Sequence, residues 1–122
     1  MRTRWTIEAE TFVSILKDLA PEVILDYSPT SLNKLDAFIT ERFEPVGSKH
    51  VGESLLLGMG CYVGEVIIRC LGGQWSQKGP EITGIGEVQA VFPLQKVLKR
   101  FRNGPVDSLF FYYETIKKHS GK

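Results

Sequence analysis

The stretch GCYVGEVIIRCLGGQW, residues 60–75, determines how the rest of the chain must be arranged. Apolar residues occupy nearly every side of it and of the residues just before it, which predicts a helix from about residue 52 to residue 71. A helix that is apolar all round has to be enclosed, so we expect it at the centre of the core. Gly72 and Gly73 predict its end, because glycine readily adopts the left-handed conformation of a helix C-cap.

Gly60 and Gly64 lie four residues apart inside this predicted helix. Each glycine costs the helix about 1 kcal/mol relative to alanine. Because glycine presents no side chain, another backbone can approach closely at these positions. We therefore expect a neighbouring element to pack directly against this face of the helix.

The same helix carries an acid and a base four residues apart, Glu65 and Arg69. This spacing and order favour an ion pair between successive turns. Alternatively, a glutamate on an apolar helix has a raised pKa and serves as a general acid or base, in a small enzyme or ligand-binding protein with a pocket around Glu65, Arg69 and Trp75. No second carboxylate or histidine stands at a spacing that supports catalysis. We therefore favour the structural interpretation, name no catalytic residue and lean against an enzyme.

Four further segments show the apolar repeat of an amphipathic helix. They cover about residues 6–20, 29–44, 93–103 and 106–119. The first is expected to bury Phe12, Ile15, Leu16 and Leu19, and the second Leu32, Leu35, Phe38 and Ile39. Ser28 and Pro29 are suited to cap and begin the second helix. With the central helix, these segments make about five helices.

Between residues 74 and 92 the pattern changes to the alternation typical of strands. Residues 74–77, 81–85 and 87–92 predict a small antiparallel sheet of two or three strands. The predicted fold class is therefore α+β. A chain of 122 residues suits one domain, so we expect residues 1–122 to form a single globular unit.

Composition and patterning favour a cytoplasmic protein that does not enter a membrane. The net charge of +1 gives no general attraction to nucleic acid or lipid. The longest apolar window, residues 55–68, is short for a membrane span, and the first residues lack the apolar segment of a secretory signal. Cys61 and Cys70 would lie about 13 Å apart on opposite faces of the helix, too far apart for a disulfide. We expect two buried free thiols, which suit a reducing compartment.

Neither a metal site nor a cofactor site is predicted. The two histidines, His50 and His119, show no spacing typical of metal ligands. The glycine pair Gly84 and Gly86 lacks the other residues of a phosphate-binding loop.

Four successive aromatic residues in the last predicted helix indicate an interface. Successive helical residues are about 100° apart, so at least one of the four must point toward solvent or a partner. The last third of the chain is also basic, with seven Lys and Arg against two acids over residues 94–122. The predicted interaction surface is Phe110, Phe111, Tyr112, Tyr113, Lys96, Lys99, Arg100 and Arg102.

Three motifs carry a resemblance to a known group. A G-x-Y-x-G-E helix begins at Gly60, a G-G-x-W strand begins at Gly72, and an F-P-x-x-K-V-x-K-R helix begins at Phe92. Together they resemble small bacterial proteins of unknown function, over roughly residues 55–115. The resemblance implies a compact α+β domain from a bacterial cytosol, and it implies no catalytic residue.

These observations lead to one main hypothesis and two alternatives. The main hypothesis is a non-catalytic protein-interaction module, of the inhibitor or immunity type, that binds another protein or forms a homo-oligomer. The first alternative is the enzyme or ligand-binding protein described above. The second is weak binding of nucleic acid through the basic last third, although nucleic-acid binders normally carry a stronger basic excess and a recognisable module.

Overall fold

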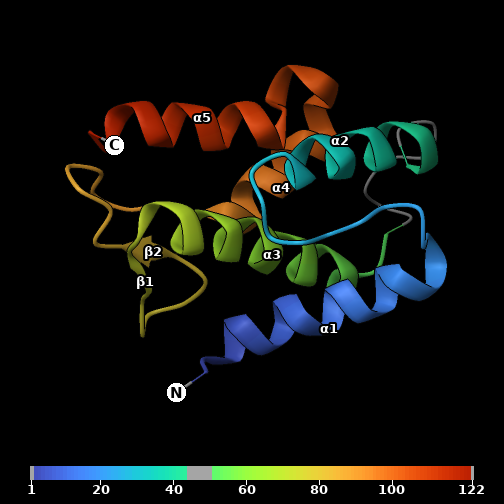
Figure 1. Ribbon diagram of the computed structural model, residues 1–122, viewed down its shortest axis with the longest axis horizontal. Helices are drawn as coiled ribbons and strands as arrows, with labels where there is room; N and C mark the ends of the chain where they lie inside the picture. The colour runs from blue at the N-terminus through green and yellow to red at the C-terminus, as the bar shows by residue number, and fades with distance from the viewer. Residues whose placement is uncertain (1, 44–50, 122) are drawn as a thin grey trace.

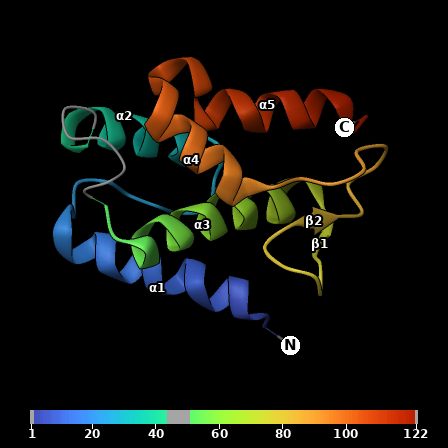
Figure 2. The ribbon, with the colours of Figure 1, turned by 180° about the vertical axis from the view of Figure 1, so that it is seen from behind.

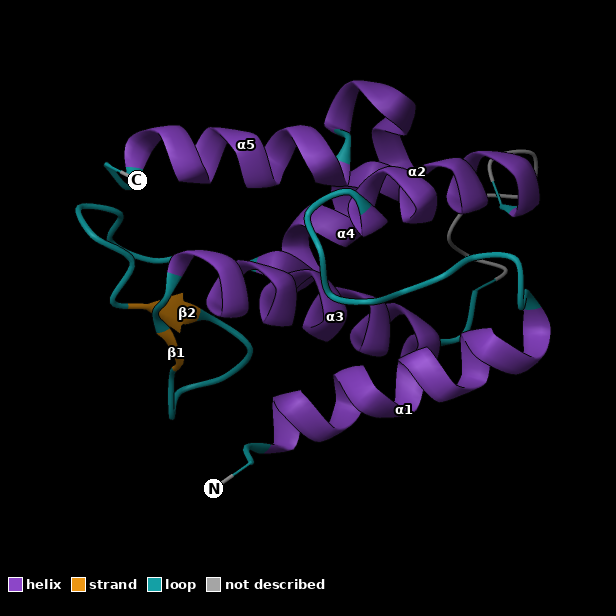
Figure 3. Cartoon of the chain, in the orientation of Figure 1, coloured by secondary structure: helices purple, strands orange, loops and turns teal. Residues whose placement is uncertain are grey.

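The computed structural model describes residues 2–43 and 51–121. In these residues it contains five α-helices, a short 3₁₀ helix and a two-stranded antiparallel sheet (Figures 1 and 3). The expected α+β class, with one mostly buried apolar helix, is confirmed. The elements are α1 (Arg4–Leu19), α2 (Ser31–Arg42), α3 (Glu53–Leu71), β1 (Gln74–Trp75), β2 (Ile82–Thr83), α4 (Pro93–Asn103), the 3₁₀ helix η2 (Gly104–Asp107) and α5 (Leu109–His119).

Helix α3 runs through the middle of the molecule, with α1 along one side and α2, α4 and α5 toward the other (Figures 1 and 2). Every residue from 58 to 67 is buried. Among the described helices, α3 is also the one long and apolar enough to cross a bilayer, yet 67% of its apolar window is buried inside the protein. That burial is typical of the core helix of a soluble protein.

The glycines of α3 permit close packing, as expected. A Cβ at Gly60 would lie 2.7 Å from the Cα of Leu94, so the backbone at the start of α4 rests on this position. Gly64 instead accommodates the indole ring of Trp75. The prediction of a close backbone neighbour is thus confirmed at Gly60, whereas at Gly64 the neighbour is a side chain.

Helix α1 begins at a cap in which the Thr3 hydroxyl accepts the backbone N–H of Thr6 at 3.1 Å. Its buried residues are Ala9, Phe12 and Leu16. The expectation that Ile15 and Leu19 belong to the buried stripe is wrong, because they are 41% and 58% exposed. The reason is that α1 lies at the edge of the molecule and packs a narrow face on α3 (Figures 1 and 2).

Helix α2 starts at Ser31, slightly later than expected. Ser28 and Pro29 form the turn before it, where the Ser28 carbonyl accepts the N–H of Ser31 at 3.1 Å. The predicted stripe of Leu32, Leu35, Phe38 and Ile39 is buried, as expected. The predicted end near Glu44, and His50 in the following loop, lie outside the described residues.

In the sheet, Gln74 pairs with Thr83 and Trp75 with Ile82. The expected third strand over residues 87–92 is reduced to isolated bridges from Val91 to Ile82 and from Val88 to Ile85. Only a short extended stretch remains there, because the turn after Ile85 takes up its first residues and α4 begins at Pro93.

The two thiols differ in environment. Cys61 is buried, and this burial raises the pKa of its thiol to about 12. Cys70 is exposed near the C-terminal end of α3, so the expectation that both thiols are buried is wrong for this residue. Its neighbour is the Tyr27 carbonyl oxygen, 3.9 Å from Sγ.

Candidate functional site

The carboxylate of Glu65 joins three elements. The Thr6 hydroxyl of α1 and the Trp75 indole N–H of β1 donate to Oε2, at 2.9 and 2.8 Å. Arg69, one turn along α3, donates to Oε1 at 3.2 Å. The residue is 5% exposed and both of its oxygens have partners. The carboxylate therefore braces α1 and β1 against α3.

Arg69 connects this brace to the segment before α2. Its guanidinium carbon lies 3.6 Å from the ring centroid of Tyr27, a cation–π contact. Tyr27 has a φ of 65°, and its backbone N–H donates to the buried Tyr62 hydroxyl at 2.9 Å. The Tyr62 hydroxyl also shares a hydrogen bond of 2.6 Å with the Ser31 hydroxyl. These contacts fix the segment between α1 and α2 on α3.

The structure thus brings together the three residues of the predicted ligand pocket, Glu65, Arg69 and Trp75. They form an ion pair and a hydrogen bond with each other, and they line none of the surface hollows described below. The indole ring of Trp75 packs against Gly64. Its centroid lies 6.5 Å from the ring centroid of Trp5. This arrangement supports a structural role for the trio.

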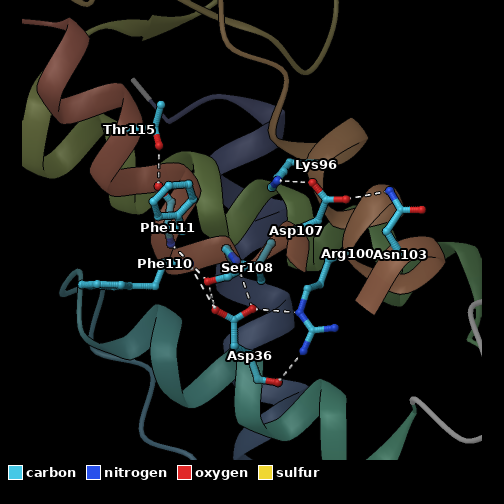
Figure 4. Close-up of polar contacts among 10 residues, drawn as sticks. Asp36, Lys96, Arg100, Asn103, Asp107, Ser108, Phe110, Phe111 and Thr115 are labelled. Carbon is cyan, nitrogen blue, oxygen red and sulfur yellow. Dashed lines mark hydrogen bonds and ion pairs between the residues drawn. The ribbon is translucent and has the colours of Figure 1, made fainter. Parts of the chain in front are cut away.

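A second carboxylate, Asp36 on α2, was not singled out from the sequence, and it organises α4 and α5 (Figure 4). The backbone N–H groups of Leu109 and Phe110 donate to its two oxygens at 3.0 and 3.1 Å, and the Ser108 hydroxyl donates at 2.9 Å. Asp36 therefore caps the N-terminus of α5 from a different helix. A lone acid on the polar face of a predicted helix gives no signal of this role.

Arg100 of α4 completes the Asp36 cluster. Its Nε donates to the Asp36 carboxylate at 3.0 Å, and its Nη2 donates to the Asp36 carbonyl and the Thr40 hydroxyl at 3.1 and 2.7 Å. Arg100 is 1% exposed. The expectation that this residue faces outward is therefore wrong, because its charge is paired inside the α2–α4 interface.

Lys96, one turn before Arg100, is also engaged. Its Nζ donates to Asp107 of η2 at 2.7 Å, and Asn103 donates to the other oxygen of Asp107 at 2.6 Å (Figure 4). The hydrogen bond from Lys96, followed by that from Asn103, holds the pKa of the Asp107 carboxyl below its usual range. Of the four basic residues predicted at the surface, Lys99 and Arg102 remain exposed.

The aromatic run divides as helical geometry requires. Phe111 is 66% exposed, which confirms that at least one of the four points away from the core. Phe110 and Tyr112 are partly buried. Tyr113 is 3% exposed and belongs to the core, so its place on the predicted surface is wrong.

Three open hollows that share lining residues lie around the first turns of α4, and we call them together the α4 groove. The largest, about 450 Å³, is lined by Glu53, Leu56, Leu57, Leu94 and Leu98. The second, about 320 Å³, shares Leu94 and is lined also by Lys78, Gly79, Pro80, Glu81, Phe92 and Gln95. The third, about 120 Å³, shares Phe92 and Gln95 and is lined also by Lys96, Lys99 and Tyr112.

The α4 groove is mainly apolar toward α3, where Glu53 also lines it, mixed in charge in the middle, where Lys78 and Glu81 line it, and basic toward α5. Leucines of α3 and α4 form the apolar end, and Phe92, in the middle, is 41% exposed. Lys99 and the ring of Tyr112 mark the basic end. The sequence pattern indicated the basic and aromatic residues but not Leu56, Leu57 and Leu98, because a helix apolar on all sides does not reveal which side stays open.

A separate hollow of about 320 Å³ lies on α5, lined by Phe111, Glu114, Thr115, Lys118 and His119. Among residues 2–43 and 51–121, no group of three or more His, Cys, Asp or Glu side chains is placed to hold a metal ion. Comparison of the chain with protein-family models, curated proteins and solved structures found no match.

Proposed function

We propose that this protein is a non-catalytic interaction module that binds a segment of a partner protein in the α4 groove. The observation that carries the proposal is that the three hollows share Leu94, Phe92 and Gln95 as lining residues, so that half-buried leucines, an exposed phenylalanine and a lysine gather on one surface. Pockets lined by apolar and aromatic residues with a few polar groups are typical binding sites.

The groove favours a segment of defined chemistry. Leu56, Leu57 and Leu98 would receive apolar side chains, and Lys99 would attract a carboxylate at the other end. The partner segment is therefore expected to be amphipathic, with acidic residues at one end.

The scaffold under the groove is held by internal contacts. Asp36 and Arg100 join α4 to α2 and α5, and Lys96 and Asp107 join α4 to η2. A surface fixed in this way loses little conformational entropy on binding, which supports affinity. The placement of Glu65, braced and 5% exposed, also supports a role in binding rather than chemistry for this chain.

The α4 groove suits a protein better than nucleic acid. Binding to phosphates draws on exposed Lys and Arg side chains. Here Arg100 is buried and Lys96 is paired with Asp107, which leaves Lys99 and Arg102 as the exposed bases of the predicted cluster. We also propose a bacterial cytoplasm as its location and an inhibitor or immunity role. The resemblance to small bacterial proteins and the free thiol of buried Cys61 support this proposal.

Photocrosslinking in the native host tests the proposal. A photoreactive amino acid replaces Gln95, which lines two of the three hollows, and a control replaces the exposed Lys34 on α2. We expect one protein to crosslink in stoichiometric amount from position 95 and not from position 34. The crosslinked peptide should contain apolar residues followed by acidic ones.

The Leu98→Asp variant provides the matched control, since it places a charge in the apolar end of the groove. It should fold and lose the crosslink from position 95. No stoichiometric crosslink from position 95, or the same crosslink from both positions, would overturn the proposal. A crosslink to RNA or DNA that weakens steeply with salt would favour the nucleic-acid alternative instead.

A further inference from the structure

The outer face of α1 carries apolar residues that the fold leaves uncovered. Ile7 and Ile15 are 46% and 41% exposed. By helical spacing they lie on the side of α1 away from its buried residues Ala9, Phe12 and Leu16. Helix α1 itself lies at the edge of the molecule (Figures 1 and 2). This face is remote from the α4 groove, so a function for it would be independent of the one proposed above.

The exposed residues of this face follow the spacing of a helix-packing seam. Positions 4, 7, 11, 15 and 18 recur every three or four residues, so they form a nearly straight line along the helix. Their residues are Arg4, Ile7, Thr11, Ile15 and Asp18. Such a line is what a second helix contacts when it packs along the first.

The line is complementary to itself when it is turned end for end about Thr11. In an antiparallel pair related by two-fold symmetry, Ile7 of one copy meets Ile15 of the other, and the two Thr11 residues meet on the axis. The same operation places Arg4 of each copy opposite Asp18 of the other. Two apolar contacts and two opposite-charge pairs thus arise from one symmetric arrangement, as an isologous interface requires.

We infer that α1 is a homodimer interface, through which a second copy of this chain packs antiparallel with its own α1. The small side chains of Thr11 and Ser14 at the centre of the face let the two helices approach closely. A contact along about 24 Å of helix is small for a homodimer. The dimer is therefore weak, with a dissociation constant on the order of 10 µM.

Charge reversal tests the pairing without harming the fold. Arg4 and Asp18 are exposed and lie in the first and last turns of α1. An aspartate in the first turn and an arginine in the last each suit the helix dipole. Asp18→Arg should therefore keep or raise the thermal stability of the monomer. Arg4→Asp also removes the cation–π contact of Arg4 with Trp5, so its melting temperature should fall by no more than a few degrees.

Sedimentation velocity of the full chain from 1 to 300 µM then reports the self-association. Each single reversal places like charges opposite each other at both ends of the interface, between position 4 of one copy and position 18 of the other. We therefore expect about tenfold weaker dimerisation. The double variant Arg4→Asp/Asp18→Arg restores both opposite pairs and should return to within threefold of wild type. Lys34→Asp changes the net charge as Arg4→Asp does, on a different helix, and should leave the dimer unchanged.

A crosslink on the symmetry axis gives a second readout. In a Cys70→Ser background, Thr11→Cys should form a disulfide-linked dimer under mild oxidation, whereas Lys34→Cys should not. A wild-type protein that stays monomeric at 300 µM would overturn the inference. So would a dimer whose single reversals have no effect, a double reversal that fails to restore it, or a Thr11→Cys variant that does not crosslink.

Discussion

Glu65 and Asp36 are single residues that each bind groups from several elements. Glu65 receives donors from α1, α3 and β1, and Asp36 receives donors from α4 and from the start of α5. A carboxylate accepts several hydrogen bonds at once, so one residue can fix several helices. Both acids therefore serve the arrangement of the helices, on which the α4 groove depends.

Removal of the Asp36 carboxylate should be severely destabilising. The Asp36→Ala variant would leave the guanidinium of Arg100, which is 1% exposed, without the Asp36 carboxylate, and the first two N–H groups of α5 without their acceptor. We expect a loss of about 3–5 kcal/mol in the free energy of unfolding, measured by urea titration. Glu22→Ala, which breaks an exposed ion pair with Arg42, should change it by less than about 1 kcal/mol. Equal effects of the two substitutions would refute the role of Asp36.

The Lys96–Asp107 pair should make stability depend on pH in the acid range. The hydrogen bonds from Lys96 and Asn103 lower the pKa of Asp107 in the folded protein, below its usual 3.8. A lowered folded-state pKa contributes stability above the unfolded-state pKa, and that contribution is lost as the pH falls through the folded-state pKa. Asp107→Asn should thus be less stable than wild type at about pH 6, and the difference should shrink toward about pH 2.5. A difference that stays constant in urea titrations at the two pH values would contradict this.

Helices α3 and α4 are in close backbone contact at one position, Gly60. The start of α4 lies on Gly60, where a Cβ would stand 2.7 Å from the Cα of Leu94 and 3.1 Å from its nitrogen. Because the obstacle is backbone, it cannot rotate away as a side chain would. The position of α4, and with it the α4 groove, rests on this glycine.

Gly60→Ala should therefore destabilise the protein, although alanine favours a helix by about 1 kcal/mol over glycine. The overpacked contact with α4 should lower the free energy of unfolding by about 1–3 kcal/mol. Gly79→Ala is the matched control, since nothing lies within 4 Å of its added Cβ, and it should stay within about 0.5 kcal/mol of wild type. Stabilisation by Gly60→Ala in thermal and urea unfolding would show that the helices are not in close contact there.

The helices could be predicted because apolar periodicity is a local property. The stripe of α2 and the end of α3 at Gly72 were both expected, and both are observed. The errors concern neighbours far away in the sequence. Ile15 continues the apolar stripe of α1, but no other element in the described part of the chain covers it, and it stays 41% exposed. Arg100 has the sequence context of a surface base, but it is buried against Asp36 of α2. The apolar pattern of a segment does not indicate which distant segments pack against it. For the same reason, the open side of the α4 groove could not be predicted.

The whole molecule divides into a scaffold and the proposed binding surface. The buried acids and Arg100 belong to the scaffold, whereas the leucines of the α4 groove, Phe92 and Lys99 belong to the surface. The two parts share α4 but use opposite faces of it. A substitution in one part should therefore leave the property of the other part intact.

The most direct measurement of this separation is photocrosslinking from position 95 in two variants, Glu65→Gln and Leu98→Asp, at equal amounts of folded protein. Glu65→Gln should lower the free energy of unfolding by about 1–2 kcal/mol and keep full capture of the partner. Leu98→Asp, on a partly buried residue, should lower the free energy of unfolding by up to about 3 kcal/mol and, at equal amounts of folded protein, lose the capture. The opposite result, in which folded Glu65→Gln loses the capture and Leu98→Asp keeps it, would contradict the proposed binding in the α4 groove. It would indicate that Glu65 takes part directly in the function.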